Sequence, residues 1–219
     1  MNRQFHKISL IMLCVAAFSG TYAGYRYQNT SSKRPVDKYE EEIEQLHSSV
    51  DKDADGIDDQ TDILYGTLSY VASEPRYKSK YYQGGYPDDG YGVCTDVVAN
   101  ALRYAGYDLM VLVEEDIRDH PEDYDVNAAD KNIDFRRVRN LAIYFRKNAK
   151  SLTTDISDTT EWQGGDIVIF QNHIGIISDR RNKNGVPYVI HHNGVWQTRY
   201  EQDILESRDD LIGHYRVSE

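Results

Sequence analysis

The chain has 219 residues, enough to bury a hydrophobic core without disulfide bonds, so its length favours one domain with appendages. Its 36 acidic residues outnumber 25 basic ones, giving a formal net charge of -11. This charge disfavours a nucleic-acid partner, because such binding depends on neutralising phosphates, and it favours solubility.

The first 23 residues have the pattern of an export signal. Arg3 and Lys7 precede a mostly apolar run over residues 8–18, and small residues follow up to Ala23. The run is short for a bilayer-spanning helix, which needs about 20 residues. We predict that residues 1–23 are a signal peptide cleaved after Ala23 or, if retained, a membrane anchor. The protein would then act outside the cytoplasm, either secreted or held at the outer face of the cytoplasmic membrane.

Cleavage would remove Cys14 and leave Cys94 as the single cysteine of the mature chain. Cysteines in an oxidising compartment are normally paired, so an unpaired one is a candidate reactive thiol. A small buried hydrophobic residue is the alternative interpretation.

Residues 24–50 are polar or charged with few apolar positions, which predicts a tether. Residues 51–62 then carry aspartates at positions 1, 3, 5, 9 and 12 of an EF-hand-like calcium loop. These are Asp51, Asp53, Asp55, Asp59 and Asp62, and the position-7 ligand would be the backbone carbonyl of Ile57.

Five carboxylates in one loop repel one another unless a cation offsets their charge. Asp62 replaces the usual bidentate glutamate, as in the extracellular calcium repeats that this loop resembles. We expect a structural calcium ion that fixes the tether onto the following helix, and a solvated acidic linker is the alternative.

Residues 63–219 are predicted to form one α+β domain. Apolar spacing predicts three helices. The first begins near Thr61 and ends before Pro75, and the other two cover 94–105 and 135–148. Residues 76–93 are predicted to be a loop. The stretch 110–134 is predicted to hold a short helical piece. Strand signals follow at 166–170, 173–178 and 188–192, with a turn at 182–185. Helices first and an antiparallel sheet later indicate the α+β class.

Thiol catalysis needs a thiolate, a base and a group that orients the base. Cys94 stands at the predicted start of a helix, where unpaired backbone amides lower the pKa of a thiol and can bind an oxyanion. His173 opens a predicted strand, in which Gly175 leaves room for a neighbouring chain or a substrate. His191 and His192 point to opposite faces of the next strand, so one can orient His173 while the other faces solvent or anchors a loop.

These motifs resemble the NlpC-type cell-wall peptidases of the papain-like superfamily. Residues 81–96, which end in Gly-Val-Cys-Thr-Asp, resemble their cysteine motif. Residues 165–170 together with 173–177 resemble their histidine strand, and residues 189–194 resemble the strand with their third polar residue. A closer similarity, over roughly residues 63–217, is to an uncharacterised branch of exported bacterial proteins that also shows the motif at 132–138.

The resemblance implies a papain-like, NlpC-type fold with N-terminal helices packed on a small antiparallel sheet. It implies an amidase or peptidase with Cys94 as nucleophile, His173 as base and His191 as the orienting residue. It also suggests Tyr81 as a hydroxyl on the oxyanion side. The implied substrate is a peptide or peptidoglycan of the bacterial cell wall, and no organic cofactor is implied.

Two departures from the family pattern affect the substrate. Thr95 and Asp96 replace the usual small pair after the cysteine, and the stretch 107–163 is longer than the minimal fold needs. Two other functions therefore stay open. One is an acyltransferase that uses the same thioester intermediate, and the other is a calcium-stabilised, non-catalytic binding module on a decayed protease fold.

Other candidates have structural alternatives. Arg136 and Arg137 could grip a substrate carboxylate or pair with Asp130 or Asp134, and we favour the ion pairs. Asp166 is expected to form a turn. Core packing is expected for both tryptophans, Trp162 and Trp196.

Overall fold

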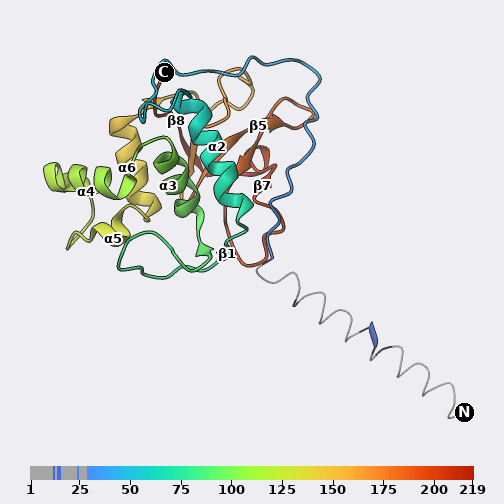
Figure 1. Ribbon diagram of the computed structural model, residues 1–219. Coiled ribbons are helices and arrows are strands. Elements are labelled where there is room, and N and C mark those ends of the chain that lie inside the picture. Colours follow the sequence, from blue (N-terminus) through green and yellow to red (C-terminus); the bar gives the residue numbers. More distant parts are fainter. Residues whose placement is uncertain (1–11, 13, 16–23, 25–28) are drawn as a thin grey trace, which may run out of the picture.

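The computed structural model describes residue 12, residues 14–15, residue 24 and residues 29–219. The predicted export segment, residues 1–23, therefore lies almost wholly outside the described residues. Among the described residues, no helix is both long enough and apolar enough to cross a membrane. Helices and one main sheet make up the described chain, which confirms the α+β class (Figure 1).

The main sheet has six antiparallel strands in the order β3-β8-β4-β5-β6-β7 within the described chain. Their bounds are β3 (Lys150–Ser151), β4 (Ile167–Phe170), β5 (His173–Arg181), β6 (Pro187–Ile190), β7 (Glu201–Gln202) and β8 (Leu211–Arg216). The sequence predicts β4, β5 and β6. It misses β8, which comes last in the chain and yet pairs between β3 and β4.

Helices cover one face of this sheet and fill the space beside it. They are α2 (Asp59–Ala72), α3 (Cys94–Tyr104), α4 (Leu109–Asp119), α5 (Lys131–Asp134) and α6 (Val138–Asn148), with short 3-10 turns η1 (Pro121–Asp123) and η2 (Leu205–Ser207). Figure 1 shows α2 and α3 in front of the sheet and α4, α5 and α6 gathered at one side. Apolar side chains of α3 and α6 bury Ile167, Ile169, Ile174 and Ile176 of the sheet in one core.

Helix α2 begins two residues earlier than its apolar pattern suggests. Asp58 is the N-cap, and its carboxylate accepts a hydrogen bond from the Thr61 amide at 3.1 Å. A side chain at position 66 would bring its Cβ within 2.4 Å of the Tyr104 Cβ, so Gly66 allows α2 to approach α3 closely. Helix α2 is therefore held at its start by a cap and along its length by α3.

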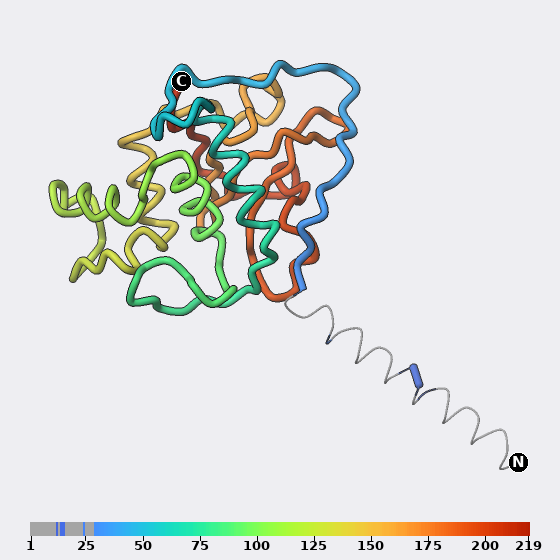
Figure 2. The backbone as a smooth tube through the Cα atoms, in the orientation of Figure 1, coloured from blue at the N-terminus to red at the C-terminus, as the bar shows by residue number. Residues whose placement is uncertain are grey.

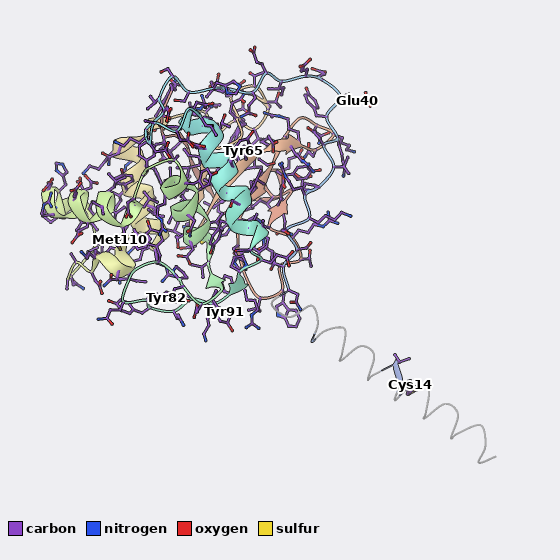
Figure 3. All side chains as sticks on the ribbon, viewed as in Figure 1. Cys14, Glu40, Tyr65, Tyr82, Tyr91 and Met110 are labelled. Carbon is purple, nitrogen blue, oxygen red and sulfur yellow. The ribbon has the colours of Figure 1, made fainter. Side chains whose placement is uncertain are left out.

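Residues 29–50, here called the strap, run in an extended path along the outside of the domain (Figure 2). The Ser31 amide donates to the Thr198 carbonyl at 3.1 Å, and the Lys38 amide donates to the Arg181 carbonyl at 2.9 Å. Arg34 binds Glu201 at 2.9 Å. The prediction of a tether is wrong for these residues, because the strap is anchored by polar contacts that leave no apolar pattern. Figure 3 shows Glu40 on the part of the strap that lies farthest out.

Candidate active site

Cys94 is the first residue of α3, as the sequence predicts. The residue is partly exposed, although burial dominates the surroundings of its thiol. Two residues before it, strand β2 (Tyr91–Gly92) pairs in parallel with β1 (Arg76–Tyr77), and this short pairing leads directly into the helix. The Asp96 carboxylate accepts a hydrogen bond from the Val93 amide at 2.8 Å. The turn that carries the thiol is thus held by the β1–β2 pairing before Cys94 and by the Asp96 carboxylate after it.

A buried ion pair holds the same turn in place. Asp96 accepts hydrogen bonds from Arg136 Nε at 2.7 Å and from Arg136 Nη2 at 2.9 Å, and both side chains are almost fully buried. Arg136 Nη1 also donates to the Lys80 carbonyl at 2.8 Å. The predicted partners of Arg136 are therefore wrong, whereas Arg137 does lie 3.6 Å from Asp134. The Asp96–Arg136 pair joins the two motifs that set this sequence apart, 92–96 and 132–138.

His173, the first residue of β5, meets His191, which directly follows β6. His173 Nε2 lies 2.9 Å from His191 Nδ1, and the two rings stand at 82° to each other. The pairing follows from the strand register, because a side chain at position 175 would place its Cβ 3.2 Å from the His191 Cβ and 2.6 Å from the Val189 Cγ1. Gly175 thus makes room for the neighbouring strand, which is one of the two roles that the sequence predicts for it.

The thiol of Cys94 lies against the residue that follows His173. The amide of Ile174, together with the amides of Thr95 and Cys94, favours the thiolate form. In the described part of the chain the His173 ring makes its hydrogen bond through Nε2, which leaves Nδ1 unengaged. The structure thus brings His173 and His191 into contact and sets the amide that follows His173 against the thiol, with no hydrogen bond between Cys94 and His173 among the described contacts. Such bonds are often long before substrate binds.

Burial dominates the electrostatics of the pair. It raises the pKa of the Cys94 thiol to about 11, and the nearby Asp96 charge adds to this effect against the three amides. The expected lowering of this pKa at the helix start is therefore wrong. Burial also lowers the pKa of His173 to about 4, helped by the positive charge of Arg208. Both shifts disfavour a resting thiolate and a resting imidazolium at neutral pH.

The structure does not bring Tyr81 to the thiol. Its side chain is 54% exposed, and its hydroxyl accepts a hydrogen bond from Asn132 of α5 at 3.1 Å. Tyr77 of β1 is the tyrosine near the thiol, since burial and then the charge on Cys94 raise the pKa of Tyr77. Sequence reasoning missed Tyr77 because a two-residue strand leaves no periodicity inside a polar loop. Figure 3 shows Tyr82 and Tyr91 of the same loop along one edge of the molecule.

His192 is fully buried, so the expectation that it faces solvent is wrong, whereas its packing on Tyr77 agrees with the alternative that it anchors a loop. Its ring packs edge-on against Tyr77 at 5.2 Å and against Tyr200 at 5.1 Å. Neither ring nitrogen has a hydrogen-bond partner among the described residues, and burial lowers its pKa to about 4. His192 therefore packs as a neutral ring behind the tyrosine that neighbours the thiol.

Arg208 is a second residue that sequence reasoning missed. Its guanidinium lies 4.3 Å from the centre of the Phe170 ring, which stacks on His173. Asp210 binds it through two hydrogen bonds of 2.8 and 2.6 Å. An arginine two residues before an aspartate in a loop carries no pattern that would link it to a distant histidine.

The remaining candidates have structural roles. Asp166 is buried at the start of β4 and accepts hydrogen bonds from the Gln163 amide, His214 and Arg216 at 2.8–3.0 Å. Trp162 is fully buried and stacks on His214 at 3.8 Å. Trp196 is 63% exposed, so the expectation of core packing is wrong for that residue.

The predicted calcium loop lies at the far end of α2 from Cys94. The 14 residues of α2 span about 21 Å, and Tyr70 near its C-terminal end packs beside Gly92. Carboxylate oxygens of Asp51, Asp53 and Asp55 lie within 4.8 Å of one another. Asp59 instead accepts hydrogen bonds from the Lys52 amide and the Tyr107 hydroxyl.

An α+β domain with a cysteine at a helix start and a histidine pair on the adjoining strands defines a candidate thiol-enzyme site. Residues 65–217 match the family described as "Domain of unknown function (DUF1287)", and the chain belongs to that family. It is 37% identical over 172 residues to the uncharacterized protein YijF of Escherichia coli (strain K12), covering 74% of this chain and 79% of that protein. No solved structure matches the chain.

Proposed function

We propose that this protein is an exported cysteine amidase or peptidase with a papain-like, NlpC-type fold. The observation that carries the proposal is the 2.9 Å contact between His173 Nε2 and His191 Nδ1. The backbone amide of Ile174, which follows His173, contacts the Cys94 thiol. A base that is oriented by a third group beside a nucleophile is the arrangement that nucleophilic catalysis needs.

The proposed mechanism requires one arrangement of the protons in this contact. If His173 Nδ1 is to accept the thiol proton, Nε2 carries the ring hydrogen and donates it to His191 Nδ1. Cys94 Sγ then bonds to the amide carbon while its proton passes to His173 and on to the leaving amine. Water next hydrolyses the thioester and restores the thiol. In this proposal the amides at the start of α3 bind the oxyanion in both steps.

The substrate class rests on the resemblance to NlpC-type enzymes and on the export signal. Peptide stems of the bacterial cell wall are the substrate that this resemblance favours. The long stretch between α3 and β4, which forms α4, α5 and α6, lies where a substrate-specific surface would be built. Arg136 is excluded as a carboxylate-binding residue because Asp96 occupies it.

The test is release of new amine and carboxyl ends from purified cell-wall fragments by the wild type and by Cys94→Ala. We expect activity in the wild type and its loss in the variant. Tyr65→Phe on the exposed face of α2 (Figure 3) is the matched control and should keep full activity. Equal activity in wild type and Cys94→Ala would contradict the proposal.

A non-catalytic binding module is the second candidate, and the raised pKa of Cys94 favours it. A module needs no thiolate, so a buried and protonated thiol would be sufficient. The two candidates differ in the effect of His173→Ala on labelling of Cys94 by iodoacetamide. An enzyme base should speed labelling near neutral pH, whereas in a module the histidine should make no difference.

A further inference from the structure

The acidic loop, residues 51–62, is folded around its own carboxylates. The Gly56 amide donates to Asp51 Oδ2 at 2.9 Å, and the Ile57 amide donates to Asp55 Oδ1 at 2.9 Å. Gly56 has a φ of 95°, which permits the sharp turn. The oxygens of Asp51, Asp53 and Asp55 lie within 4.8 Å of one another, which is about twice the 2.3–2.6 Å length of a calcium–oxygen bond. One ion can therefore touch all three.

A second and independent observation points to a ligand. Asp62 is 1% exposed, and its Oδ1 has no hydrogen-bond partner among the described residues. Leaving a buried carboxylate oxygen unpaired is costly. Asp62 lies near enough to the loop for the charges of Asp55, Asp53 and Asp51 to act on it. A cation would stabilise a buried carboxylate that has an unpaired oxygen close to three other carboxylates.

We propose that the acidic loop binds one calcium ion through Asp51, Asp53, Asp55 and Asp62, together with the position-7 carbonyl of Ile57. Hard oxygen donors of high negative charge suit calcium and magnesium alike. Asp62 lies outside the 4.8 Å group, so the site must tolerate uneven ligand distances. Calcium accepts such a site, whereas magnesium demands near-ideal octahedral geometry.

Asp59, the position-9 residue, lies outside the group of three neighbouring carboxylates, and the proposed set of direct ligands does not include it. It accepts hydrogen bonds from the Lys52 amide at 2.8 Å and from the Tyr107 hydroxyl. Position 9 often acts through a water molecule in loops of this type. The four other aspartates and the Ile57 carbonyl remain as direct donors. Asp59 instead ties the loop to the residues that follow α3.

The ion would lock three parts of the chain together. On one side, Asp58 accepts a hydrogen bond from the Ser48 amide of the strap at 2.9 Å. Ser48 Oγ in turn lies 3.0 Å from Ser218 Oγ near the C-terminus, and Figure 2 shows these two segments meeting. On the other side, Asp53 packs against Gly106 at the end of α3. The calcium site is separate from the proposed catalytic residues, and its role is to hold the fold.

The test measures thermal unfolding of the full chain in calcium chloride, in magnesium chloride and in EGTA. We expect a higher Tm in calcium than in EGTA, and a smaller increase in magnesium. Terbium should bind with luminescence sensitised by tyrosine, and calcium should displace it. Asp62→Asn and Asp53→Asn should each weaken calcium binding at least tenfold, while Asp125→Asn, whose side chain is 89% exposed, should bind as the wild type does.

The decisive readout is whether the order of stability of Asp62→Asn and the wild type reverses when calcium is added. Without calcium, Asp62→Asn should be at least as stable as the wild type, because it removes a buried charge. With calcium it should be less stable, because it lacks a ligand. An unchanged Tm in calcium together with no terbium binding would overturn the proposal, and so would equal calcium stabilisation of the wild type and Asp62→Asn.

Discussion

At the scale of single residues, the site combines groups whose charged forms are all disfavoured by burial. Burial lowers the pKa of His173 to about 4, lowers that of His191 as well, and raises the pKa of Cys94. A resting ion pair of thiolate and imidazolium is therefore disfavoured. Attack must be coupled to proton transfer, so the protein would depend on substrate binding to bring sulfur, base and carbonyl together.

Alkylation of Cys94 by iodoacetamide tests this resting state. Because burial raises the thiol pKa to about 11, the thiolate fraction and the rate should rise about tenfold per pH unit from pH 7 to pH 10. A small free thiol, with a pKa of about 8.5, should level off within that range. A rate for Cys94 that reaches its plateau below pH 8 would mean that the thiolate is preformed.

Arg208 offers a second test, through the pKa of His173. Its positive charge disfavours the imidazolium, and Asp210 acts in the opposite direction. Arg208→Gln should raise the pKa of His173 and move the acid limb of kcat/KM to higher pH. Arg208→Lys keeps the charge and should leave both nearly unchanged. Titration of the histidine by NMR gives the same answer without an activity assay, and an unshifted pKa in Arg208→Gln would refute the effect.

At the scale of elements, the start of α3 is fastened to the segment before α6 by the Asp96–Arg136 pair. Both side chains are buried, so removing one leaves an uncompensated charge in the interior. Strand β5 packs against α3 from the other side, which places the residue after His173 against the thiol. The ion pair is thus a positioning element that acts on the nucleophile through the helix start.

Arg136→Met should lower the free energy of unfolding by about 3–5 kcal/mol, as expected when one partner of a buried ion pair is lost. The double variant Asp96→Leu/Arg136→Met should recover much of this stability, because no charge is left unpaired. Arg137→Met breaks a partly exposed pair 3.6 Å long and should cost less than about 1 kcal/mol. Urea unfolding measures all three, and equal losses for Arg136→Met and Arg137→Met would contradict the argument.

The elements with strong apolar periodicity could be predicted from the sequence. The apolar faces of α2, α3 and α6 repeat at three- and four-residue intervals, and β4 to β6 are dense in β-branched residues. Strands β3 and β7 have two residues each, too few for a pattern. Strand β8 lacks a simple apolar pattern because it contains Gly213, His214 and Arg216. The buried side chains of His214 and Arg216 bind Asp166, a partner that no local pattern in the sequence shows.

The candidate site was predictable to the extent that local motifs place its residues. Cys94 follows a glycine-containing loop and opens an amphipathic helix, and the two histidines directly follow strand β6. Tyr77 and Arg208 depend on contacts between distant segments, and so does the partner of Arg136. The sign of the Cys94 pKa shift was wrong, because the sequence shows the helix amides and does not show how deeply the thiol is buried.

At the scale of the whole molecule, the strap closes the domain from the outside. It starts beside residues 198–201, crosses β5 near Arg181 and ends near the C-terminus. Arg34 joins it to Glu201, which is nearly buried. The proposed calcium ion would fasten the last part of the same path, so the strap, the acidic loop and the two ends of the described domain form one continuous support.

Three buried, neutral histidines make the stability of this molecule depend on pH. Folded His173 and His192 have pKa values of about 4, whereas an unfolded histidine has about 6.5. Between these values the unfolded chain binds more protons, so the stability present above pH 6.5 is lost as pH falls. The loss between pH 6.5 and pH 5 should be about 2 kcal/mol for each of the two residues, and His191 adds to it in the same direction.

The measurement is the free energy of unfolding in urea at pH 7, 6 and 5. Asp62, with a pKa raised to about 6 by burial and by its acidic neighbours, acts in the opposite direction, so the series is best run in the Asp62→Asn background. Asp58 has its pKa lowered to about 2, since hydrogen bonds from Thr61, His47 and Ser48 outweigh its burial, and it titrates below this window.

His192→Phe keeps the packing between Tyr77 and Tyr200. It should reduce the dependence of the unfolding free energy on pH by the contribution of one histidine. A free energy that stays constant from pH 7 to pH 5 would mean that these rings keep an ordinary histidine pKa in the folded protein, which would contradict the argument from burial.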